Sequence, residues 1–356
     1  MQIIHIVTSI SRINFGVWNA AIYASEYLQR TYNISSELWV CSKCETDIIE
    51  PPIPYYYFHK KQKNVKGFRN WIEHFDKTET IIVTHGAWLL PTRLGCIAKN
   101  YGFKWIYTPH GMFEPDYVSK GRLKKFIYFN LIEKRLVTKS DRIRAVSDSE
   151  KLNLEKKFRR DVKVVYNGVN LQQVTRVEKD NKNLNFLFLA RLQKKKGLIY
   201  LVKAWADFMY DSPNAKLIVA GPDEGELDFV KPFIKKNIFY FGPAYGKDKI
   251  KLFQKAHYYV LPSFSEGFPT SVVEAMSFGA IPIISEGCNF PEVFNEQLGY
   301  EVKTDKESIK NILKQLLSKP FDYNLSKRNI LFVEQNFTEE IIGDQLYSLY
   351  SNLILK

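Results

Sequence analysis

The sequence predicts an α/β protein built from two doubly wound domains. Short apolar runs with the length of buried strands alternate with longer segments whose apolar residues recur at helical spacing. This alternation starts afresh in the second half of the 356 residues, after a polar segment at residues 172–183 that resembles a domain linker. Alternation of this kind is typical of parallel sheets covered by helices.

In the first half, apolar runs predict buried strands at residues 3–9, 37–41, 81–84, 104–108, 144–147 and 162–166. Periodic segments predict helices at residues 17–29, 92–100 and 120–140. Ser147 and Glu150 have the spacing of a capping box that opens a further helix. Two consecutive strands end in His-Gly, at His85 and His110. Ligands of such sheets bind beyond the carboxyl ends of the strands, so both histidines are candidates, although a lone histidine is more often structural.

The second half predicts strands at residues 185–190, 216–221, 238–241, 258–261 and 281–285. It predicts helices at residues 198–209, 247–255, 308–318 and 338–355, and one more between Ser271 and Gly279. We therefore expect a first domain at residues 1–170 and a second domain at residues 171–337.

The stretch at residues 263–279 carries the most chemistry. A strand leads into a loop with one carboxylate, Glu266, which turns through Gly267 and Pro269 into a helix whose N-terminus can bind an anion. Ser271 and Glu274 have capping-box spacing, and Gly279 is placed to end the helix. The alternative is that Glu274 only caps the helix and Glu266 is a solvated charge.

Two cations follow the first strand of the second half. Arg191 leaves the strand end and Lys196 starts the next helix, so both are expected at one helix N-terminus, where they suit a pyrophosphate. An exposed basic turn is the alternative interpretation. In the first half, the loop after the first strand holds a single glycine, Gly16, instead of a Gly-x-Gly-x-x-Gly string.

Four stretches together resemble retaining GT-B glycosyltransferases of family 4. They are Glu266-Gly-Phe-Pro-x4-Glu274-Ala-Met with the following Gly-Ala-Ile-Pro, Pro109-His-Gly-Met-x-Glu-Pro115, Arg191-Leu-x3-Lys-Gly197, and residues 286–292. The last stretch departs from the family pattern, because Cys288-Asn289 replaces its usual second glycine. The resemblance implies a GT-B fold, with two Rossmann-like domains facing a cleft and the last helix, residues 338–356, packing back on the first domain.

The resemblance also implies roles for particular residues. A UDP- or GDP-sugar donor would be held mainly by the second domain and the acceptor by the first. Arg191 and Lys196 would bind the diphosphate, Glu266 the donor sugar and Glu274 the ribose. Further contacts are expected from His110 beside the donor sugar, from Gly16, and from the stretch of Gly267, Phe268, Pro269 and Thr270, whose backbone N–H groups would add donors. There is no Asp-x-Asp, so neither a catalytic metal nor another cofactor is expected.

The predicted function is that of a retaining hexosyltransferase. It would move a sugar to a glycan or a lipid-linked saccharide, in the synthesis of a bacterial surface polysaccharide. A sugar-nucleotide 2-epimerase of the same fold is the alternative, and it would consume donor without any acceptor. A nucleic-acid-binding protein is disfavoured, because no recognition helix, zinc finger or aromatic RNA-binding motif is present.

Charge and cysteine content bear on location. The net charge is +13, and residues 1–175 hold 27 Lys and Arg against 16 Asp and Glu. This basic half, with the basic and aromatic residues 120–135, predicts salt-sensitive binding to an anionic membrane surface. The lysines and arginine at positions 120, 122, 124 and 125 would supply the charge, and Phe126, Tyr128 and Phe129 are candidates for shallow insertion or for the core. The start of the sequence lacks signal-peptide features, which predicts a cytoplasmic protein.

The four cysteines are expected to be free thiols. Cys41 and Cys44 form one C-x-x-C pair, and Cys96 and Cys288 are isolated. A structural zinc site usually needs four ligands, and the sequence has no second pair. A redox role for Cys41 and Cys44 is the alternative.

Overall fold

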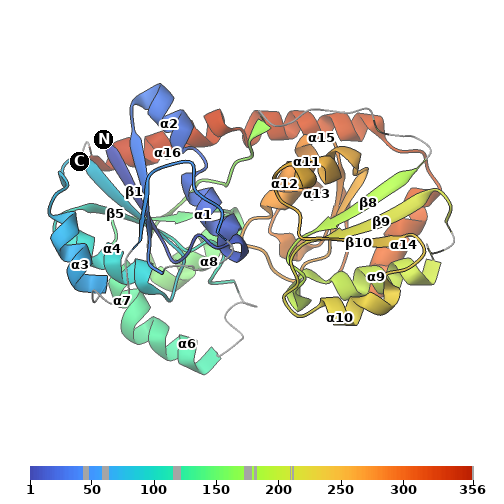
Figure 1. Ribbon diagram of the computed structural model, residues 1–356, viewed down its shortest axis with the longest axis horizontal. Helices are drawn as coiled ribbons and strands as arrows, with labels where there is room; N and C mark the ends of the chain where they lie inside the picture. The colour runs from blue at the N-terminus through green and yellow to red at the C-terminus, as the bar shows by residue number, and fades with distance from the viewer. Residues whose placement is uncertain are drawn as a thin grey trace. The chain divides into compact units, whose positions relative to one another are not determined.

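The computed structural model describes residues 1–42, 48–57, 64–114, 122–171, 179, 183–208, 210 and 212–354. The chain divides into two compact units, unit 1 with Met1–Gly168 and Glu339–Lys356, and unit 2 with Val169–Thr338. Figure 1 shows that each unit is a sheet flanked by helices. The predicted α/β class is confirmed, because every strand pairing within both sheets is parallel.

The sheet of unit 1 has seven strands in the order β3-β2-β1-β4-β5-β6-β7. The strands are β1 (Gln2–Val7), β2 (Ser35–Val40), β3 (Tyr55–Tyr57), β4 (Thr80–His85), β5 (Lys104–Thr108), β6 (Arg142–Ala145) and β7 (Val162–Val164). The chain fills one half of the sheet outward from β1 and the other half outward from β4. The topological switch point therefore lies between β1 and β4, where ligands bind in sheets of this kind.

Helices cover both faces of this sheet. They are α1 (Phe15–Ile22), α2 (Ser25–Tyr32), α3 (Asn64–Ile72), α4 (Leu90–Asn100), α6 (Arg122–Tyr128), the π-helical segment η3 (Phe129–Glu133), α7 (Lys134–Val137), α8 (Asp148–Phe158) and α16 (Glu339–Ile354). One core contains Trp39 and Trp105 with side chains from α3, α4 and α8. A second contains Ile3 and Val83 with side chains from α2 and α16, and a third contains Val7 and Trp18.

The last helix, α16, is held to α2 by polar and aromatic contacts. The hydroxyls of Tyr27 and Tyr32 donate to Oδ1 of Asp344 at 2.6 and 2.8 Å. Tyr32 also stacks on Tyr347, with ring centroids 3.8 Å apart. The C-terminal helix of the chain is thus part of unit 1.

Unit 2 has six strands in the order β10-β9-β8-β11-β12-β13. They are β8 (Leu184–Leu189), β9 (Ala215–Ala220), β10 (Ile238–Gly242), β11 (Tyr258–Leu261), β12 (Ile281–Ile284) and β13 (Tyr300–Glu301). Its α-helices are α9 (Leu198–Phe208), α10 (Leu227–Val230), α11 (Gly246–Lys255), α12 (Thr270–Ser277), α13 (Glu292–Asn295), α14 (Lys306–Leu317) and α15 (Tyr323–Asn336). Here the switch point lies between β8 and β11, the strands that precede Arg191 and Glu266.

Several predicted elements differ from the structure. The predicted helix at residues 17–29 is two helices, α1 and α2, and the predicted helix at residues 120–140 contains the π-helical segment η3 between α6 and α7. Helix α15 was not predicted, because its buried face carries Ser326 and Asn329, which remove the apolar repeat. These two side chains instead donate to the carbonyls of Gly279 and Leu298 at 2.6 and 2.8 Å.

Candidate functional site

The most deeply buried charges among the predicted donor-binding residues of unit 2 form an ion pair between Lys196 and Glu266. The Lys196 Nζ lies 2.5 Å from Oε1 and 2.6 Å from Oε2 of Glu266. Each side chain is only 10% exposed. Lys196 follows β8 and Glu266 follows β11, and these two strands pair directly. The pair therefore lies at the switch point of the sheet, where a ligand is expected.

Backbone contacts hold the two loops that carry this pair. The carbonyl of Lys195 accepts from the N–H of Phe264 at 2.8 Å and from Oγ of Ser263 at 3.0 Å. Gly197 has a φ of +71°, and a Cβ there would lie 2.1 Å from the carbonyl oxygen of Pro262. Only glycine fits this position. The Lys-Gly dipeptide of the motif thus places the Lys196 side chain against the β11 loop.

The loop of Glu266 is also fixed from the other side. The Glu266 N–H donates to the carbonyl of Gly287 at 2.8 Å, and Nδ2 of Asn289 donates to the Glu266 carbonyl at 2.5 Å. Asn289 is one of the two residues that replace the usual second glycine of the family pattern, and it adopts a left-handed φ of 54°. An asparagine tolerates this conformation better than most residues, so the departure keeps the backbone turn that a glycine would make.

The electrostatics of the pair favour an ionised Glu266. Burial raises the pKa of this carboxyl, but the charges of Lys196 and Lys195 and hydrogen bonds from Lys196 and Ser263 outweigh burial, so the pKa lies below its usual value. The pKa of Lys195 is lowered, first by burial and then by the neighbouring charge of Lys196. Its ammonium is thus easier to deprotonate than that of an exposed lysine.

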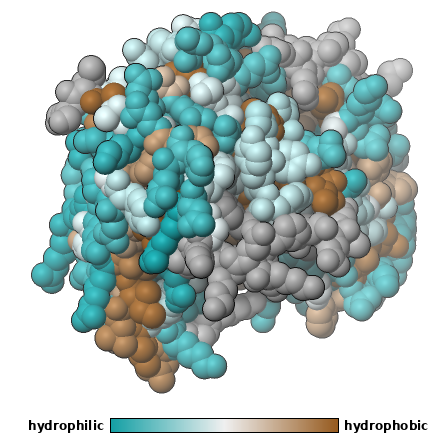
Figure 2. All heavy atoms as spheres, turned by 60° about the vertical axis from the view of Figure 1, so that its left-hand side comes forward, coloured by the Kyte–Doolittle hydropathy of each residue, from teal (hydrophilic) through white to brown (hydrophobic). Residues whose placement is uncertain are grey.

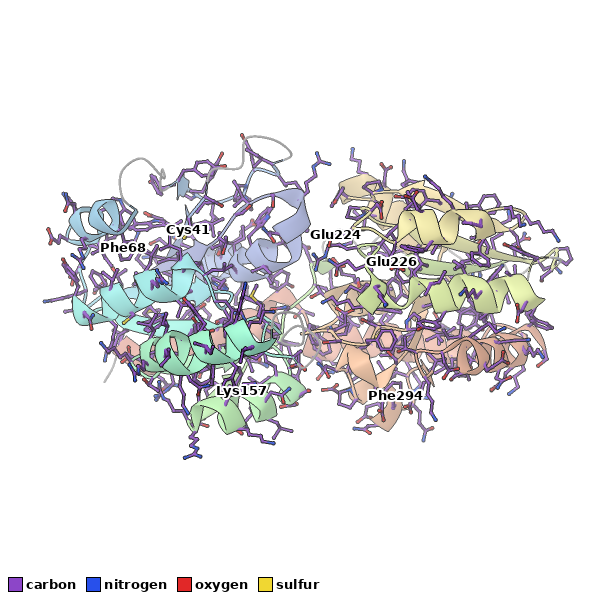
Figure 3. All side chains as sticks on the ribbon, turned by 90° about the horizontal axis from the view of Figure 1, so that it is seen from below. Cys41, Phe68, Lys157, Glu224, Glu226 and Phe294 are labelled. Atoms are coloured by element: carbon purple, nitrogen blue, oxygen red, sulfur yellow. The ribbon has the colours of Figure 1, made fainter. Side chains whose placement is uncertain are left out.

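Arg191 forms a second, more exposed ion pair in the same cluster. Its Nη1 lies 3.0 Å from Oε1 of Glu224, and the two side chains are 38% and 19% exposed. Glu224 and Glu226, both labelled in Figure 3, come from the turn after β9. The charges of Arg191, Glu224, Lys196 and Glu266 all act on Lys195. The structure therefore brings Arg191 and Lys196 into one charged cluster, but each is paired with a carboxylate. The sequence analysis missed Glu224, because an acidic residue in a polar turn has no distinctive signal.

Glu274 does not form the predicted capping box. Helix α12 begins at Thr270, one residue before Ser271, and no side chain caps it. Glu274 instead pairs with Lys249 of α11, with 2.7 Å between Nζ and Oε1. Ser271 lies inside the first turn, where its Oγ is 2.8 Å from the Tyr259 hydroxyl. The interpretation of Glu274 as only a cap was therefore wrong.

The remaining predicted residues of this loop divide into two kinds. Phe268 is buried and packs on Phe290 and Phe337, with ring centroids 5.6 and 5.7 Å apart, so its side chain belongs to the core. Gly267 and Thr270 are half-buried at the start of α12. The prediction that Gly279 ends this helix is confirmed by its φ of +74° and by the hydrogen bond from Ala280 N–H to the carbonyl of Ala275.

In unit 1, His110 is the end of a chain of three histidines. Nδ1 of His5 lies 3.0 Å from Nε2 of His85, and Nδ1 of His85 lies 2.8 Å from Nε2 of His110. His5 and His85 are buried, and His110 is half-buried. Burial, followed by the charge of Arg144, lowers the pKa of His5 and of His110 to about 3. Burial also lowers the pKa of His85, so all three rings are neutral at pH 7.

A buried carboxylate supports the turn that carries His110. Glu150 of α8 accepts from the N–H of Gly111 at 2.5 Å and from the N–H of Val146 at 2.8 Å. Burial raises its pKa to about 7. The sequence analysis noted Glu150 only as part of a capping box. Half of that box forms, since Ser147 Oγ accepts from the Glu150 N–H, but the Glu150 carboxylate reaches the His110 turn instead.

The remaining predicted residues are Gly16 and the four cysteines. Gly16 is exposed in the first turn of α1, and a Cβ there would meet nothing within 4 Å. Cys41, Cys96 and Cys288 are buried free thiols, whereas Cys44 lies outside the described residues. In the described part of the chain, no group of three or more His, Cys, Asp or Glu side chains could hold a metal ion.

Solved structures match the fold over its whole length. A sucrose-phosphate synthase from Thermosynechococcus elongatus superposes with a TM-score of 0.80 at 19% identity, covering 100% of this chain and 99% of that chain. An Anabaena protein in complex with UDP and glucose superposes with a TM-score of 0.75 at 16% identity, covering 99% and 100%. At identities this low, the superpositions show the fold alone. That fold is GT-B.

Sequence profiles identify the family. The profile described as "Glycosyl transferases group 1" matches residues 172–331, and the one described as "Glycosyltransferase Family 4" matches residues 18–173. The two profiles describe the same family. Together they cover the predicted donor-site motifs and the His110 turn. The chain belongs to the group 1, family 4 glycosyltransferases.

Curated relatives match part of the chain. One is an uncharacterized 41.2 kDa protein in the cps region of Klebsiella pneumoniae, 30% identical over 207 residues, or 55% of this chain and 56% of the relative. Another is the N,N'-diacetylbacillosaminyl-diphospho-undecaprenol alpha-1,3-N-acetylgalactosaminyltransferase of Campylobacter jejuni, 30% identical over 184 residues, or 49% and 47%. The chain thus spans about half the length of these relatives.

Proposed function

We propose that the protein transfers a hexosyl group from a UDP- or GDP-sugar to a lipid-linked saccharide, with retention and without a metal ion. The observation that carries this proposal is the buried pair of Lys196 and Glu266 at the switch point of unit 2. It places a fixed cation and an ionised carboxylate side by side. A nucleotide sugar has the complementary groups, a diphosphate and sugar hydroxyls, next to one another.

The cations of unit 2 would bind and stabilise the leaving group. Lys196 and Arg191 would contact the diphosphate, replacing part of the attraction that each now has to Glu266 or Glu224. Charge grows on the leaving phosphate as the glycosidic bond breaks, so cations fixed nearby stabilise the transition state more than the ground state. The N-terminus of α12 would add its positive end to the same anion.

The carboxylates would bind hydroxyl groups. Glu266 would accept hydrogen bonds from the donor sugar and Glu274 from the ribose. Such charge-assisted bonds typically contribute about 1.5–3 kcal/mol each. Glu274 is already held by Lys249, which fixes the direction of its free oxygen lone pairs. Neither carboxylate is assigned as a nucleophile. The leaving phosphate would instead take the proton of the attacking hydroxyl on the same face of the sugar.

His110 would contact the donor sugar as a neutral imidazole. A neutral ring offers one donor and one acceptor, and its Nε2 already faces His85. Only Nδ1 remains for the substrate. Unit 1 would bind the acceptor, and a polyprenyl diphosphate acceptor is supported by the name of the Campylobacter relative.

The decisive experiment measures nucleotide release from a panel of UDP- and GDP-sugars, with and without polyprenyl-diphosphate saccharides. We expect nucleotide release only when donor and acceptor are both present, in proportion to the lengthened saccharide, and unchanged by EDTA. NMR of the product should show the anomeric configuration of the donor. Consumption of donor in the absence of acceptor would instead support the epimerase. Inversion of configuration, or loss of activity with EDTA, would contradict the mechanism.

A further inference from the structure

The outer face of α6 and η3 is apolar. Leu123, Phe126, Ile127 and Leu131 are 71, 65, 48 and 55% exposed. Their spacing of three, four and eight residues places them on one side of a helix. A surface helix normally has polar side chains on the face away from the core, so an apolar outer face is unusual. No helix of the described residues is long and apolar enough to cross a membrane.

The inner side of the same segment is occupied by the core of unit 1. Phe129 packs on Phe113 and Phe158, with ring centroids 5.7 and 5.4 Å apart. The Lys157 Nζ, labelled in Figure 3, lies 6.0 Å from the Phe113 and Phe129 ring centroids. Of the aromatic residues considered for insertion, Phe129 thus belongs to the core, and Phe126 lies outside.

The segment that carries the apolar face is rich in basic residues. Between residues 122 and 139 the sequence has six basic residues and one carboxylate, Glu133. Glu133 is fully buried, where it accepts from the Tyr107 and Thr92 hydroxyls, so it does not neutralise the surface. Lys124 and Arg135 are exposed. Figure 2 shows a brown, apolar patch at the lower left of the face in view, with teal, hydrophilic side chains beside it. The patch lies at the height of α6 in Figure 1.

We propose that the outer face of α6 docks on an anionic lipid bilayer, with its apolar side chains in the headgroup region and Lys124 and Arg135 against lipid phosphates. Apolar residues flanked by cations are the chemistry of interfacial helices. A second copy of this chain is the poorer occupant, because it would bring two equally basic surfaces together. The docking does not depend on the proposed function, although a lipid-linked acceptor would be reached from the same surface.

Co-sedimentation of the full chain with vesicles tests this proposal. We use vesicles of neutral phosphatidylcholine, with and without phosphatidylglycerol, at low and high salt. Binding should require the anionic lipid and weaken as salt rises. The double variant Leu123→Ser/Phe126→Ser should reduce the bound fraction at least about tenfold, since each buried large apolar side chain contributes several-fold to partitioning. Lys124→Ser/Arg135→Ser should reduce it about thirtyfold, as two charges near an anionic leaflet predict.

Matched controls come from unit 2. Phe229 and Leu331 are 65% and 53% exposed, and Lys203 and Lys327 are exposed on α9 and α15. Their serine variants should bind vesicles like the wild type. The proposal is overturned if these controls lose binding equally, if neutral vesicles bind as well, or if nothing binds. It is also overturned if Leu123→Ser/Phe126→Ser dissociates a dimer in sedimentation velocity and leaves vesicle binding unchanged. Unaltered thermal unfolding of each variant excludes misfolding, and glycosyl transfer to a short soluble acceptor separates docking from catalysis.

Discussion

The candidate side chains of unit 1 are neutral, whereas those of unit 2 are charged, although both groups lie at the switch point of a parallel sheet. In unit 1, burial keeps His5, His85 and His110 unprotonated. In unit 2, Glu266 stays ionised at similar burial because Lys196 contacts both of its oxygens. A buried group is neutral when it has no counter-charge and ionised when it has one. The charged site suits a diphosphate and the neutral site suits uncharged hydroxyls.

Breaking the ion pair of unit 2 should have the largest effect. Lys196→Ala leaves Glu266 buried and unpaired, which typically costs about 3–5 kcal/mol of stability. It should also reduce turnover at least about tenfold, because the proposed role of this cation is to oppose charge in the transition state. Chemical denaturation and steady-state kinetics measure the two effects. In Lys196→Met/Glu266→Gln, stability should return while activity does not. Normal turnover in the single variant would contradict the phosphate assignment.

The histidines of unit 1 should make its stability depend on pH. Their pKa values in the folded state lie below the ordinary value of 6.5, so the unfolded chain binds more protons and stability is lost as pH falls below 6.5. Glu150 opposes this between pH 7 and 4.5, because its folded pKa of about 7 lies above its ordinary value. Between pH 6.5 and 4.5 the unfolded chain binds three more protons on the histidines, and the folded chain binds one more on Glu150. The net difference of two protons predicts a loss of about 3 kcal/mol of stability per pH unit.

Tryptophan fluorescence can follow this transition in unit 1, which holds every tryptophan of the sequence except Trp205. Urea unfolding at several pH values gives the slope. His85→Gln should lower it by about 1.4 kcal/mol per pH unit. The exposed His74 is the matched control, and His74→Gln should leave the slope unchanged. A slope that is equal in both variants would mean that the chain of histidines is not neutral.

The two carboxylates of unit 2 should separate nucleotide binding from turnover. Glu274→Gln should weaken binding of free UDP or GDP about tenfold, because its assigned partner is the ribose. Glu266→Gln should leave nucleotide affinity within about threefold but reduce turnover at least about tenfold. Calorimetry with the free nucleotide and kinetics with the full donor distinguish the two. If Glu274→Gln binds nucleotide like the wild type, its only role is the pair with Lys249.

The sequence predicted the fold well because its signals are local. Buried parallel strands are short apolar runs, and glycines at positive φ, such as Gly197 and Gly279, mark loops that accept no other residue. The partners of the site residues could not be predicted in the same way. Glu224 and Lys249 approach Arg191 and Glu274 only through folding of distant segments. Histidine spacing likewise gave no sign that His5, 80 residues before His85 in the sequence, would join it.

The smallest effect concerns two serines that have identical capping-box spacing in the sequence. Ser147 Oγ accepts from the Glu150 N–H at 3.2 Å, whereas Ser271 contacts the Tyr259 hydroxyl, which also donates to the Leu189 carbonyl. Ser147→Ala should therefore cost about 1 kcal/mol and increase amide exchange in the first turn of α8. Ser271→Ala should cost at most about 0.5 kcal/mol, because Tyr259 keeps its acceptor, and should leave exchange in α12 unchanged. Equal protection losses in both helices would show that Ser271 caps α12 in solution.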